Sequence, residues 1–576
     1  MKKESLTLRL AILCLGLLAG LASFTVAQDT IRLSVDASAA AKNVVHVKET
    51  LTPRTGTFDL FYPKWIPGEH SPTGTINDVV NLYFLGDGKP LEWRRDDVEM
   101  FAFHVIVPPG TKRLEVDFDD VSQPGTVATA NLARIKWNRL LMYPRGVKSD
   151  LIKVTASMQY PADWKYATAL SVTSESAGFA NFGEVDLTTL IDSPAIMGKY
   201  FAKIPLSGGD ALVEMDIAGE TADSIKYGAG TLEGWKNLIT QANLAFGGHH
   251  YRSYKFLLTL SDNGGDEGLE HHESSEDGTG EKALTDKLEL LELGDLLGHE
   301  YTHSWNGKYR RPASLTTADF EIPMHGDMLW VYEGLTQYMG HVLPARSGLW
   351  TPDMFRESVA ETFAMMDTQT GRRWRPLVDT ATAVQYTYSS PRAWMNERRR
   401  VDYYYEGSLI WLDADVLIRK NSGGRLSLDD FLHKFHGGVS GSPRVVTYDL
   451  TDIVRTLNEV VPYDWTGFFN ERVYAVNVNA PIGGITNGGW KLVYNDTPNL
   501  AGQVEDNRRE MASIMYSIGM IVNEAGEVRD INPNLAAAKS GLAPGMMIKS
   551  VNGKDFTVEE LQKAVAATKS GPGQIT

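Results

Sequence analysis

The chain has 576 residues, of which 43% are hydrophobic and 22% charged, and its formal net charge at pH 7 is −16. A single hydrophobic core cannot organise a chain of this length, so we expect about three or four domains. The composition is that of ordinary globular protein and argues against a largely disordered chain. The acidic charge argues against a nucleic-acid-binding protein, which needs a surplus of lysine and arginine on one face.

The first 27 residues have the features of an export signal. A basic start (Lys2, Lys3 and Arg9) precedes an apolar run at residues 10–21, and small residues at 25–27 would form the cleavage site. We expect cleavage after residue 27 and export to the periplasm or the exterior. An uncleaved membrane anchor is the alternative, although the run is short for a full span. No later apolar run approaches spanning length, so we expect no membrane span in the mature chain.

The only cysteine, Cys14, lies inside this apolar run. The mature chain would therefore contain no thiol. This excludes a catalytic cysteine, disulfide bonds and cysteine-ligated zinc from its chemistry.

Residues 28–215 consist of short alternating segments separated by Gly, Pro and Asp, as at residues 56–62 and 113–119. A period of two predicts strands with one buried face. We therefore expect an N-terminal antiparallel β domain.

Residues 216–495 change to longer helical patterns, which predict an α-rich domain. We expect helices at 232–246, 281–303 and 328–343 and a strand at 254–261.

Residues 500–576 return to strand-like alternation, with a short helix at 535–540. This predicts a third domain of about 75 residues, whose last strand is expected to be incomplete. The fold class expected for the whole chain is multidomain α+β.

The stretch HEYTHSWNGKYRRP at residues 299–312 places two histidines four residues apart. On a helix, His299 and His303 then share one face, about 6 Å apart along the axis, so both imidazoles can bind one tetrahedral zinc ion. Glu300 lies about 100° further around the helix, where it can act as general base on a metal-activated water molecule without being a ligand. The pattern favours a metal site, and the alternative is a surface helix with two solvated histidines.

A catalytic zinc ion needs a third protein ligand and keeps one position open for water. The downstream candidates are Glu321, His325, Asp327, Glu333 and His341. Glu333 interrupts an apolar and aromatic helical stretch, where a carboxylate is costly to bury unless it is paired or metal-bound. We therefore predict Glu333 as the third ligand, with a core glutamate in an ion pair as the alternative. Gln337, one turn later, is a candidate for orienting the histidines.

Two motifs in order, HExxHxW at 299–305 and WxxEGxxxY at 330–338, make the chain resemble the gluzincin metallopeptidases, whose zinc ligands are two histidines and a glutamate. The resemblance narrows with NGK and RRP at 306–312, GLEH at 268–271 and PKWIPG at 63–68. Together these resemble the M61 family, the glycyl aminopeptidase type with a PDZ domain, over nearly the whole mature chain. The resemblance implies one zinc ion per chain and a thermolysin-like fold for residues 216–495.

The resemblance also implies roles for two further residues. In the related aminopeptidases the glutamate of the GLEH loop grips the α-ammonium of the substrate, which makes Glu270 the substrate-binding candidate. Gluzincins of this kind stabilise the oxyanion with the tyrosine of a YxxG pattern, which here is Tyr404 to Gly407. Tyr403 and Tyr405 are rivals for this role because the three tyrosines are consecutive. The residue before the glycine is Glu406, where the family often has lysine.

The last domain resembles a PDZ module, with YSIGM at 516–520 as the carboxylate-binding loop and SGLAPG at 540–545 as a later turn. Such a loop takes an extended peptide as an added strand, so peptide or protein C-termini are expected partners. Met546 stands where relatives usually have aspartate.

The sequence thus predicts an exported zinc aminopeptidase that removes N-terminal residues, glycine or other small ones, from peptides. His299, His303 and Glu333 would hold the metal, Glu300 and Tyr404 would be catalytic, and Glu270 would bind the substrate. One alternative is a PDZ-guided zinc endopeptidase. The other is a peptidase fold that has lost activity and serves as a binding module.

Overall fold

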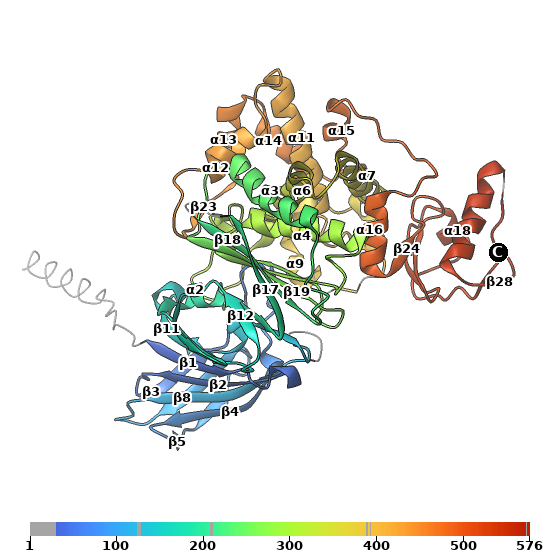
Figure 1. Cartoon of the computed structure of the whole chain (residues 1–576). Coiled ribbons are helices and arrows are strands. Elements are labelled where there is room, and N and C mark those ends of the chain that lie inside the picture. Colours follow the sequence, from blue (N-terminus) through green and yellow to red (C-terminus); the bar gives the residue numbers. More distant parts are fainter. Residues whose placement is uncertain (1–29, 124–127, 208–210, 388–389, 392, 572) are drawn as a thin grey trace, which may run out of the picture.

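The computed structural model describes residues 30–123, 128–207, 211–387, 390–391, 393–571 and 573–576 (Figure 1). The expected export signal at residues 1–27, including Cys14, lies outside the described residues. Along the described chain, an N-terminal region of β-sheets is followed by a helical region built on one sheet and by a small C-terminal region.

Three sheets make up the N-terminal region as far as it is described. Their strand orders are β13-β14-β11-β1-β2-β8-β4-β5 with β15 added to β11, β10-β3-β7-β6, and β12-β16-β9. In β1, Ile31, Leu33 and Val35 are buried while Arg32 and Ser34 are exposed, as the alternation predicts. This confirms the expected N-terminal β-sheet domain. The expectation that it is antiparallel throughout is wrong, because β1 and β11 form a parallel pair.

The elements of this region are β1 (Ile31–Asp36), β2 (Val44–Leu51), β3 (Gly56–Phe61), β4 (Val79–Gly86), β5 (Lys89–Pro90), β6 (Trp93–Arg95), β7 (Ala102–Val107), β8 (Leu114–Val121), β9 (Leu132–Ile135), β10 (Tyr143–Pro144), β11 (Lys153–Gln159), β12 (Lys165–Thr168), β13 (Val172–Ser176), β14 (Phe179–Phe182), β15 (Val185–Asp186), α2 (Leu187–Ile191) and β16 (Ala195–Gly198).

The helical region rests on a sheet with the order β17-β18-β19-β21-β20. Strands β18 (Leu212–Gly219), β19 (Ser253–Leu260) and β21 (Ser274–Thr279) are parallel, whereas β17 (Tyr200–Ser207) and β20 (Glu267–Glu270) run antiparallel at the two edges. This sheet starts at Tyr200, before residue 215, where the sequence places the end of the first domain. Strands β17 and β18 alternate like the strands before them, and only their pairing partners assign them to the second region.

The helices of this region are α3 (Ala229–Phe246), α4 (Lys287–His303), α5 (Leu329–Tyr332), α6 (Gly334–Ser347), α7 (Pro352–Thr368), α8 (Leu377–Thr382), α9 (Val384–Thr387), α10 (Met395–Arg398), α11 (Tyr405–Asn421), α12 (Leu428–His436), α13 (Leu450–Val460), α14 (Trp465–Phe469) and α15 (Gly483–Asn487), and a short pair joins β22 (Arg310–Pro312) to β23 (Val446–Tyr448).

All three expected helices differ in their ends, and α3 begins at Ala229 instead of residue 232. Helix α4 begins at Lys287 instead of residue 281, because the Asp286 side chain caps it by accepting the N–H groups of Leu288 and Glu289. The helix expected at 328–343 is two helices, α5 and α6, which meet at Glu333.

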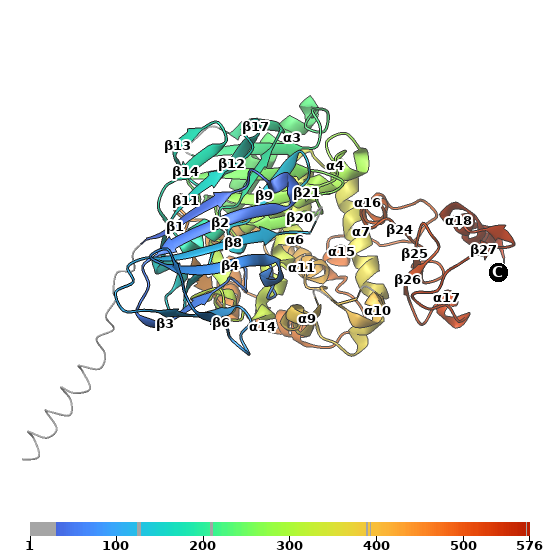
Figure 2. The ribbon, with the colours of Figure 1, turned by 90° about the horizontal axis from the view of Figure 1, so that it is seen from below.

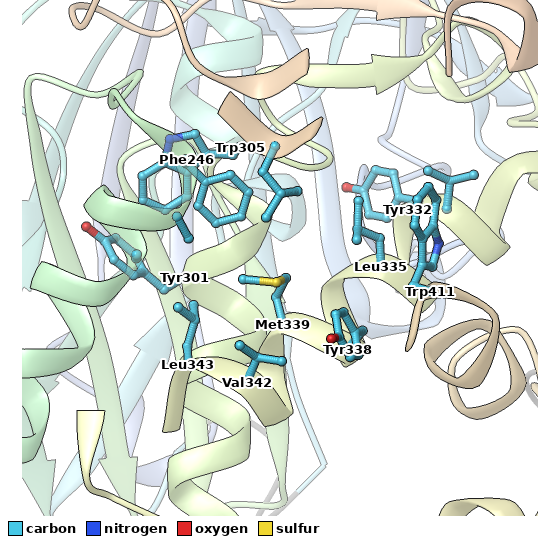
Figure 3. Packing of buried hydrophobic residues seen from close by; sticks show 14 of the residues in the cluster. Phe246, Tyr301, Trp305, Tyr332, Leu335, Tyr338, Met339, Val342, Leu343 and Trp411 are labelled. Carbon is cyan, nitrogen blue, oxygen red and sulfur yellow. The ribbon is translucent and has the colours of Figure 1, made fainter. Parts of the chain in front are cut away.

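The main core fixes the rotation of the helix that carries the two histidines. The ring of Trp305 stacks on Phe246 of α3, with centroids 4.5 Å apart and 6° between the planes (Figure 3). Tyr301 of α4 packs edge-on against Trp305 and is fully buried. Tyr301 lies two residues from each histidine, which is about 200° around the helix, so its burial turns His299 and His303 to the opposite face.

The C-terminal region has a core of its own, formed by residues such as Val522, Val528 and Leu561. Its elements are α16 (Leu500–Arg509), β24 (Met511–Ser513), β25 (Met520–Asn523), β26 (Val528–Ile531), α17 (Ala536–Lys539), β27 (Ser550–Val551), β28 (Lys554–Asp555) and α18 (Val558–Ala567). Helix α16 lies against α7 and connects this region to the helical one (Figures 1 and 2).

Within the described residues, no helix has both the length and the apolar character needed to cross a membrane.

A buried carboxyl group lies in the N-terminal sheet, far from the histidines of α4. Glu49 of β2 has no exposed surface; its Oε2 accepts the N–H of Met142 at 2.8 Å. Burial raises the pKa of Glu49 to about 8, although the Met142 hydrogen bond opposes the rise. The folded protein therefore binds a proton that the unfolded chain releases near pH 4.5.

This raised pKa makes stability fall as pH rises from about 5 to about 8. We expect Glu49→Gln to remove most of that loss, since glutamine keeps an acceptor for Met142 and cannot ionise. The difference in unfolding free energy between the two proteins should change by a few kcal/mol, on the order of 1.4 kcal/mol per pKa unit. Urea unfolding followed by tryptophan fluorescence at pH 5.5 and pH 9 measures it. Equal pH slopes for both proteins would show that Glu49 is already ionised in the fold.

Candidate metal centre

Three donor atoms from α4 and the α5–α6 junction converge on one point. His299 Nε2 and His303 Nε2 lie 3.1 Å apart, and each lies 3.2 Å from Glu333 Oε2. All three side chains are buried. The sequence predicted these residues as a ligand set, and the fold brings them together.

The donor set fits a zinc ion. Ligands at about 2.0–2.1 Å in a tetrahedron lie about 3.3–3.4 Å from one another, close to the separations found here. Glu333 Oε2 is also a buried acceptor without a hydrogen bond from the described residues, facing two imidazole nitrogens. An uncompensated carboxylate oxygen in this position is what a cation would satisfy.

A backbone hydrogen bond orients the imidazole of His303. Its Nδ1 lies 2.8 Å from the backbone oxygen of Asn306, to which it donates, leaving Nε2 as the free lone pair. The Asn306 side chain in turn donates to the backbone oxygens of Val331 and Tyr332, which ties α4 to α5. Gln337, the candidate from the sequence for this orienting role, instead donates to Asp295 and contacts His341.

Glu333 is held by a histidine that the sequence did not single out. His70 of the N-terminal region forms a short hydrogen bond through Nε2 with Glu333 Oε1, across 263 residues of chain. Burial opposes ionisation of Glu333, but the charges of His303 and His70 hold its pKa well below the ordinary value. His70 lies two residues after the PKWIPG motif at 63–68, yet nothing in the sequence connects a loop histidine to a helix so far along the chain.

Other expected ligands do not join a metal cluster. Among the described residues, two groups could hold a metal ion: His299 with His303 and Glu333, and His303 with Glu270 and Glu300. The first has the geometry given above. Neither group includes Glu321, His325, Asp327 or His341.

Glu300 lies beside the histidines with one oxygen uncommitted. Its Oε2 is buried and accepts no hydrogen bond from the described residues. Gly268 allows this placement, because a Cβ atom there would lie 2.6 Å from Glu300 Oε1. Burial, reinforced by the charge of Glu270, raises the pKa of Glu300 well above its ordinary value. The carboxyl group can therefore hold a proton at this position.

Glu270 lies at the end of β20 and has the opposite electrostatics. Its Oε1 accepts a short hydrogen bond from the hydroxyl of Tyr332. Burial opposes ionisation, but the positive charges of His303 and Lys308 lower the pKa of Glu270 below its ordinary value. A buried carboxylate that stays ionised is suited to hold a cation.

The three consecutive tyrosines face different surroundings. The ring of Tyr404 stacks on His299 with centroids 5.9 Å apart, and Tyr404 lines the pocket that contains Glu270, Glu300 and Glu333. Tyr403 is fully buried in the main core, and Tyr405 opens α11 on the side of a larger cavity. Only Tyr404 of the three therefore lines the pocket of the predicted ligands.

Glu406 has a structural explanation. It is buried and receives short ion pairs from the guanidinium groups of Arg372 and Arg399. This network locks the segment that precedes α11, and with it Tyr404. A lysine at position 406 would face two buried arginines.

The end of the stretch HEYTHSWNGKYRRP, residues 308–311, makes structural contacts. The Nζ of Lys308, fully buried, lies 3.0 Å from Oδ1 of Asp192 in the N-terminal region. Arg310 lies over the ring of Phe435 at 4.1 Å, and Arg311 donates to a backbone oxygen four residues earlier. These residues connect the end of α4 to the N-terminal region and to α12.

The pocket around these groups has a volume of about 140 Å³. Gly68 and Glu69 line it from the N-terminal region, and Leu269 and Glu270 from β20. Gly68 has φ +101°, and a Cβ atom there would lie 2.6 Å from Leu269 and 2.8 Å from Glu270. The N-terminal loop thus closes the pocket directly over Glu270.

Comparison with known proteins adds matches to two family models and to solved structures. The model of the M61 glycyl aminopeptidase family matches residues 292–410, and that of the peptidase M61 N-terminal domain matches residues 32–199. Among solved structures, the chain is similar to an aminopeptidase N family protein from Idiomarina loihiensis, with a TM-score of 0.78, 18% identity, and coverage of 93% of this chain and 92% of that one. At this identity the likeness shows the fold alone. No curated protein matches the sequence.

His70 should act on metal affinity through Glu333. We expect His70→Ala to weaken zinc binding by about 10–100-fold, because the carboxylate loses the donor that orients it. Competition with a chromophoric chelator measures this. His46→Ala, which removes a half-exposed histidine of β2 paired with Asp119, is the control and should leave the affinity unchanged. Equal affinities for the His70 variant and the wild type would contradict the role.

Proposed function

We propose that the metal of this protein is zinc and that the protein removes small N-terminal residues from peptides. The proposal starts from its membership of the M61 glycyl aminopeptidase family of metallopeptidases. The observation that carries the proposal is the pairing of the His299, His303 and Glu333 set with two further buried carboxylates, Glu300 and Glu270. One has a raised and the other a lowered pKa. Such divergence between neighbouring carboxyl groups separates an acid–base role from a binding role.

His299, His303 and Glu333 would hold the zinc ion, as their donor geometry supports. When bound, zinc would act as a Lewis acid on the scissile carbonyl and make water more acidic. His70 keeps Glu333 oriented, and the Asn306 carbonyl keeps His303 in the tautomer with a free Nε2.

Glu300 would act as general base and then as general acid. Its free Oε2 accepts a proton from the attacking water, whose oxygen bonds to the carbonyl carbon. When the C–N bond breaks, Glu300 returns this proton to the leaving nitrogen. The raised pKa supports the second half of the cycle, because the protonated carboxyl group persists until the amine departs.

Tyr404 would stabilise the oxyanion. Its ring lies on His299 at the pocket wall, and a phenol donates a hydrogen bond without carrying charge. The Glu406 network with Arg372 and Arg399 supports this role, since it holds the backbone that presents Tyr404.

Glu270 would bind the free α-ammonium of the substrate. An ammonium group leaving water needs a carboxylate partner, and Glu270 is buried and ionised within the same pocket as Glu300. A fixed distance between the two carboxylates then places the first peptide bond at the reacting groups. The small volume and the Gly68 wall leave room for glycine or another small first side chain.

Two further assignments belong to this proposal. Residues 500–576 would form a PDZ-like domain, supported by the β24-β25-β26 sheet, the β27-β28 hairpin, and helices α17 and α18 around a separate core. The protein would be exported, supported by the basic start, the apolar run and the small residues at its end within residues 1–27.

Replacement of Glu300 tests the reaction chemistry. We expect Glu300→Gln to lower kcat for glycinamide by roughly 10²–10⁴-fold while zinc content stays at one per chain, because the isosteric amide cannot accept the proton. Hydrolysis is followed by amine release, and zinc by elemental analysis of the same sample. Unchanged kcat in a zinc-loaded variant would show that another group is the base.

A matched pair of substrates tests the role of Glu270. We expect a peptide with a free N-terminal glycine to be cleaved at least about 100-fold faster than its acetylated form, since acetylation removes the charge that Glu270 holds. Glu270→Gln should abolish this preference mainly by slowing the free peptide. Equal rates for both peptides on the wild type would favour the endopeptidase alternative. A zinc-loaded wild type that cleaves neither would favour the inactive binding module.

A further inference from the structure

A larger cavity, of about 520 Å³, adjoins the pocket that contains Glu270, Glu300 and Glu333. His299, Glu300 and Tyr404 line both spaces, whereas Gly68 and Glu270 line only the small one. A substrate with its ammonium at Glu270 and its scissile bond at Glu300 therefore extends its following residues into the larger cavity. The volume lies within the range of about 300–1,000 Å³ typical of sites that enclose small ligands, which leaves space for a few residues.

The walls of this cavity come from two regions of the chain. Helices α4 and α7 and the segment before α11 form one side. The other side belongs to the C-terminal region and consists of Ala501, Val504, Glu505, Arg508 and Arg509 of α16, Met511 of β24, Ile521 of β25, and Arg529 and Asp530 of β26. The C-terminal region is thus part of the space next to the reacting groups.

Polar contacts hold this wall in place. The hydroxyl of Tyr516 donates to Glu361 of α7 at 2.6 Å. The amide of Asn532 donates to the backbone oxygen of Thr368 at 3.0 Å, and Asp530 accepts the N–H of Asn396 at 3.0 Å. Tyr516 belongs to the loop expected to bind a peptide carboxylate, and here its side chain faces the helical region.

The sheet of the C-terminal region leaves no edge of β25 free. Strand β25 pairs with β24 on one side and with β26 on the other. The N–H groups of Ser517, Ile518 and Gly519 donate to the carbonyl of Ile514 within the loop. Addition of a peptide strand to β25 therefore requires β24 to leave, whereas the cavity wall is accessible as it stands.

The cavity is lined by both charged and flexible apolar side chains. Five methionines contribute, namely Met354, Met365, Met366, Met395 and Met511, together with Val504 and Ile521. Methionine fills irregular spaces and adapts to different partners. Meanwhile Arg508 and Arg529 have acidic partners within the C-terminal region, at Glu505 and Glu527. The C-terminal wall therefore offers a peptide an adaptable apolar part, beside charged side chains that are already paired.

We propose that the C-terminal region, through α16 and β25, forms the distal wall of the site for the residues that follow the scissile bond, and that this wall favours apolar residues there. The inference rests on the proposed aminopeptidase function and deepens it. The substrates are then short peptides with a small first residue followed by apolar ones.

Narrowing the cavity from the C-terminal side tests this. In the zinc-loaded full chain, we expect Ala501→Trp to lower kcat/KM for Gly-Leu-Leu by about tenfold or more, and to leave glycinamide within about twofold, because only the tripeptide reaches the wall. Asn507→Trp, on the exposed face of α16, is the control and should change neither. Equal loss on both substrates, or no loss on the tripeptide, would overturn the proposal.

Two further measurements keep the test decisive. Ile521→Ala enlarges the cavity from β25 and should reduce the preference for Gly-Leu-Leu over Gly-Gly-Gly; an unchanged preference contradicts the proposal. Calorimetry on the Glu300→Gln protein should show weaker binding of Gly-Leu-Leu when Ala501→Trp is added. This binding result does not depend on turnover, so failure of the wild type to cleave glycinamide would overturn the proposed function and leave the wall separately tested.

Discussion

The carboxylate of Glu333 is the constraint on which the site depends. A buried carboxylate is costly unless positive or donating groups surround it, and here His299, His303 and His70 do so from three directions. Two of these histidines, His299 and His303, lie on α4, and the third, His70, lies in the N-terminal region. The β-sheet region is therefore not an independent module: it completes the coordination environment and, through Gly68, the pocket wall.

Buried charges are also paired at the contact between the N-terminal and helical regions. Lys308 is fully buried and pairs with Asp192, whose oxygens also lie near His271 and His272. His303, in its protonated form, and Lys308 favour the ionised form of Glu270, and the charge of Glu270 favours a proton on Glu300. Two carboxyl groups of similar intrinsic acidity thus acquire opposite tendencies from their surroundings. That division is the physical basis for giving one a binding role and the other an acid–base role.

The two ends of a substrate would lie in two different spaces. The side of the first residue is a small pocket whose wall is a glycine that tolerates no side chain, and the side of the leaving peptide is a larger space with methionines. The first is built by the N-terminal region and β20, the second by α4, α7 and the C-terminal region. In the reaction we propose, the first residue would meet a strict limit set by the backbone at Gly68, and the leaving peptide would meet adaptable methionine side chains.

The sequence by itself determined that the N-terminal domain is built of strands, that the two histidines lie on a helix, and that His299, His303 and Glu333 are candidate metal donors, because alternation, helical spacing and a charge in an apolar run are local signals. Helical geometry also indicated Glu300, whereas Glu270 and Tyr404 were indicated only through motifs, and three consecutive tyrosines were left unresolved. Tertiary structure decided that Tyr404 lines the pocket, that His70 holds Glu333, that β17 and β18 belong to the second sheet, and that α16 and β25 wall the larger cavity. Most of these features depend on contacts between residues at least about 100 positions apart, and a loop histidine or an edge strand carries no periodic pattern that could reveal its partner.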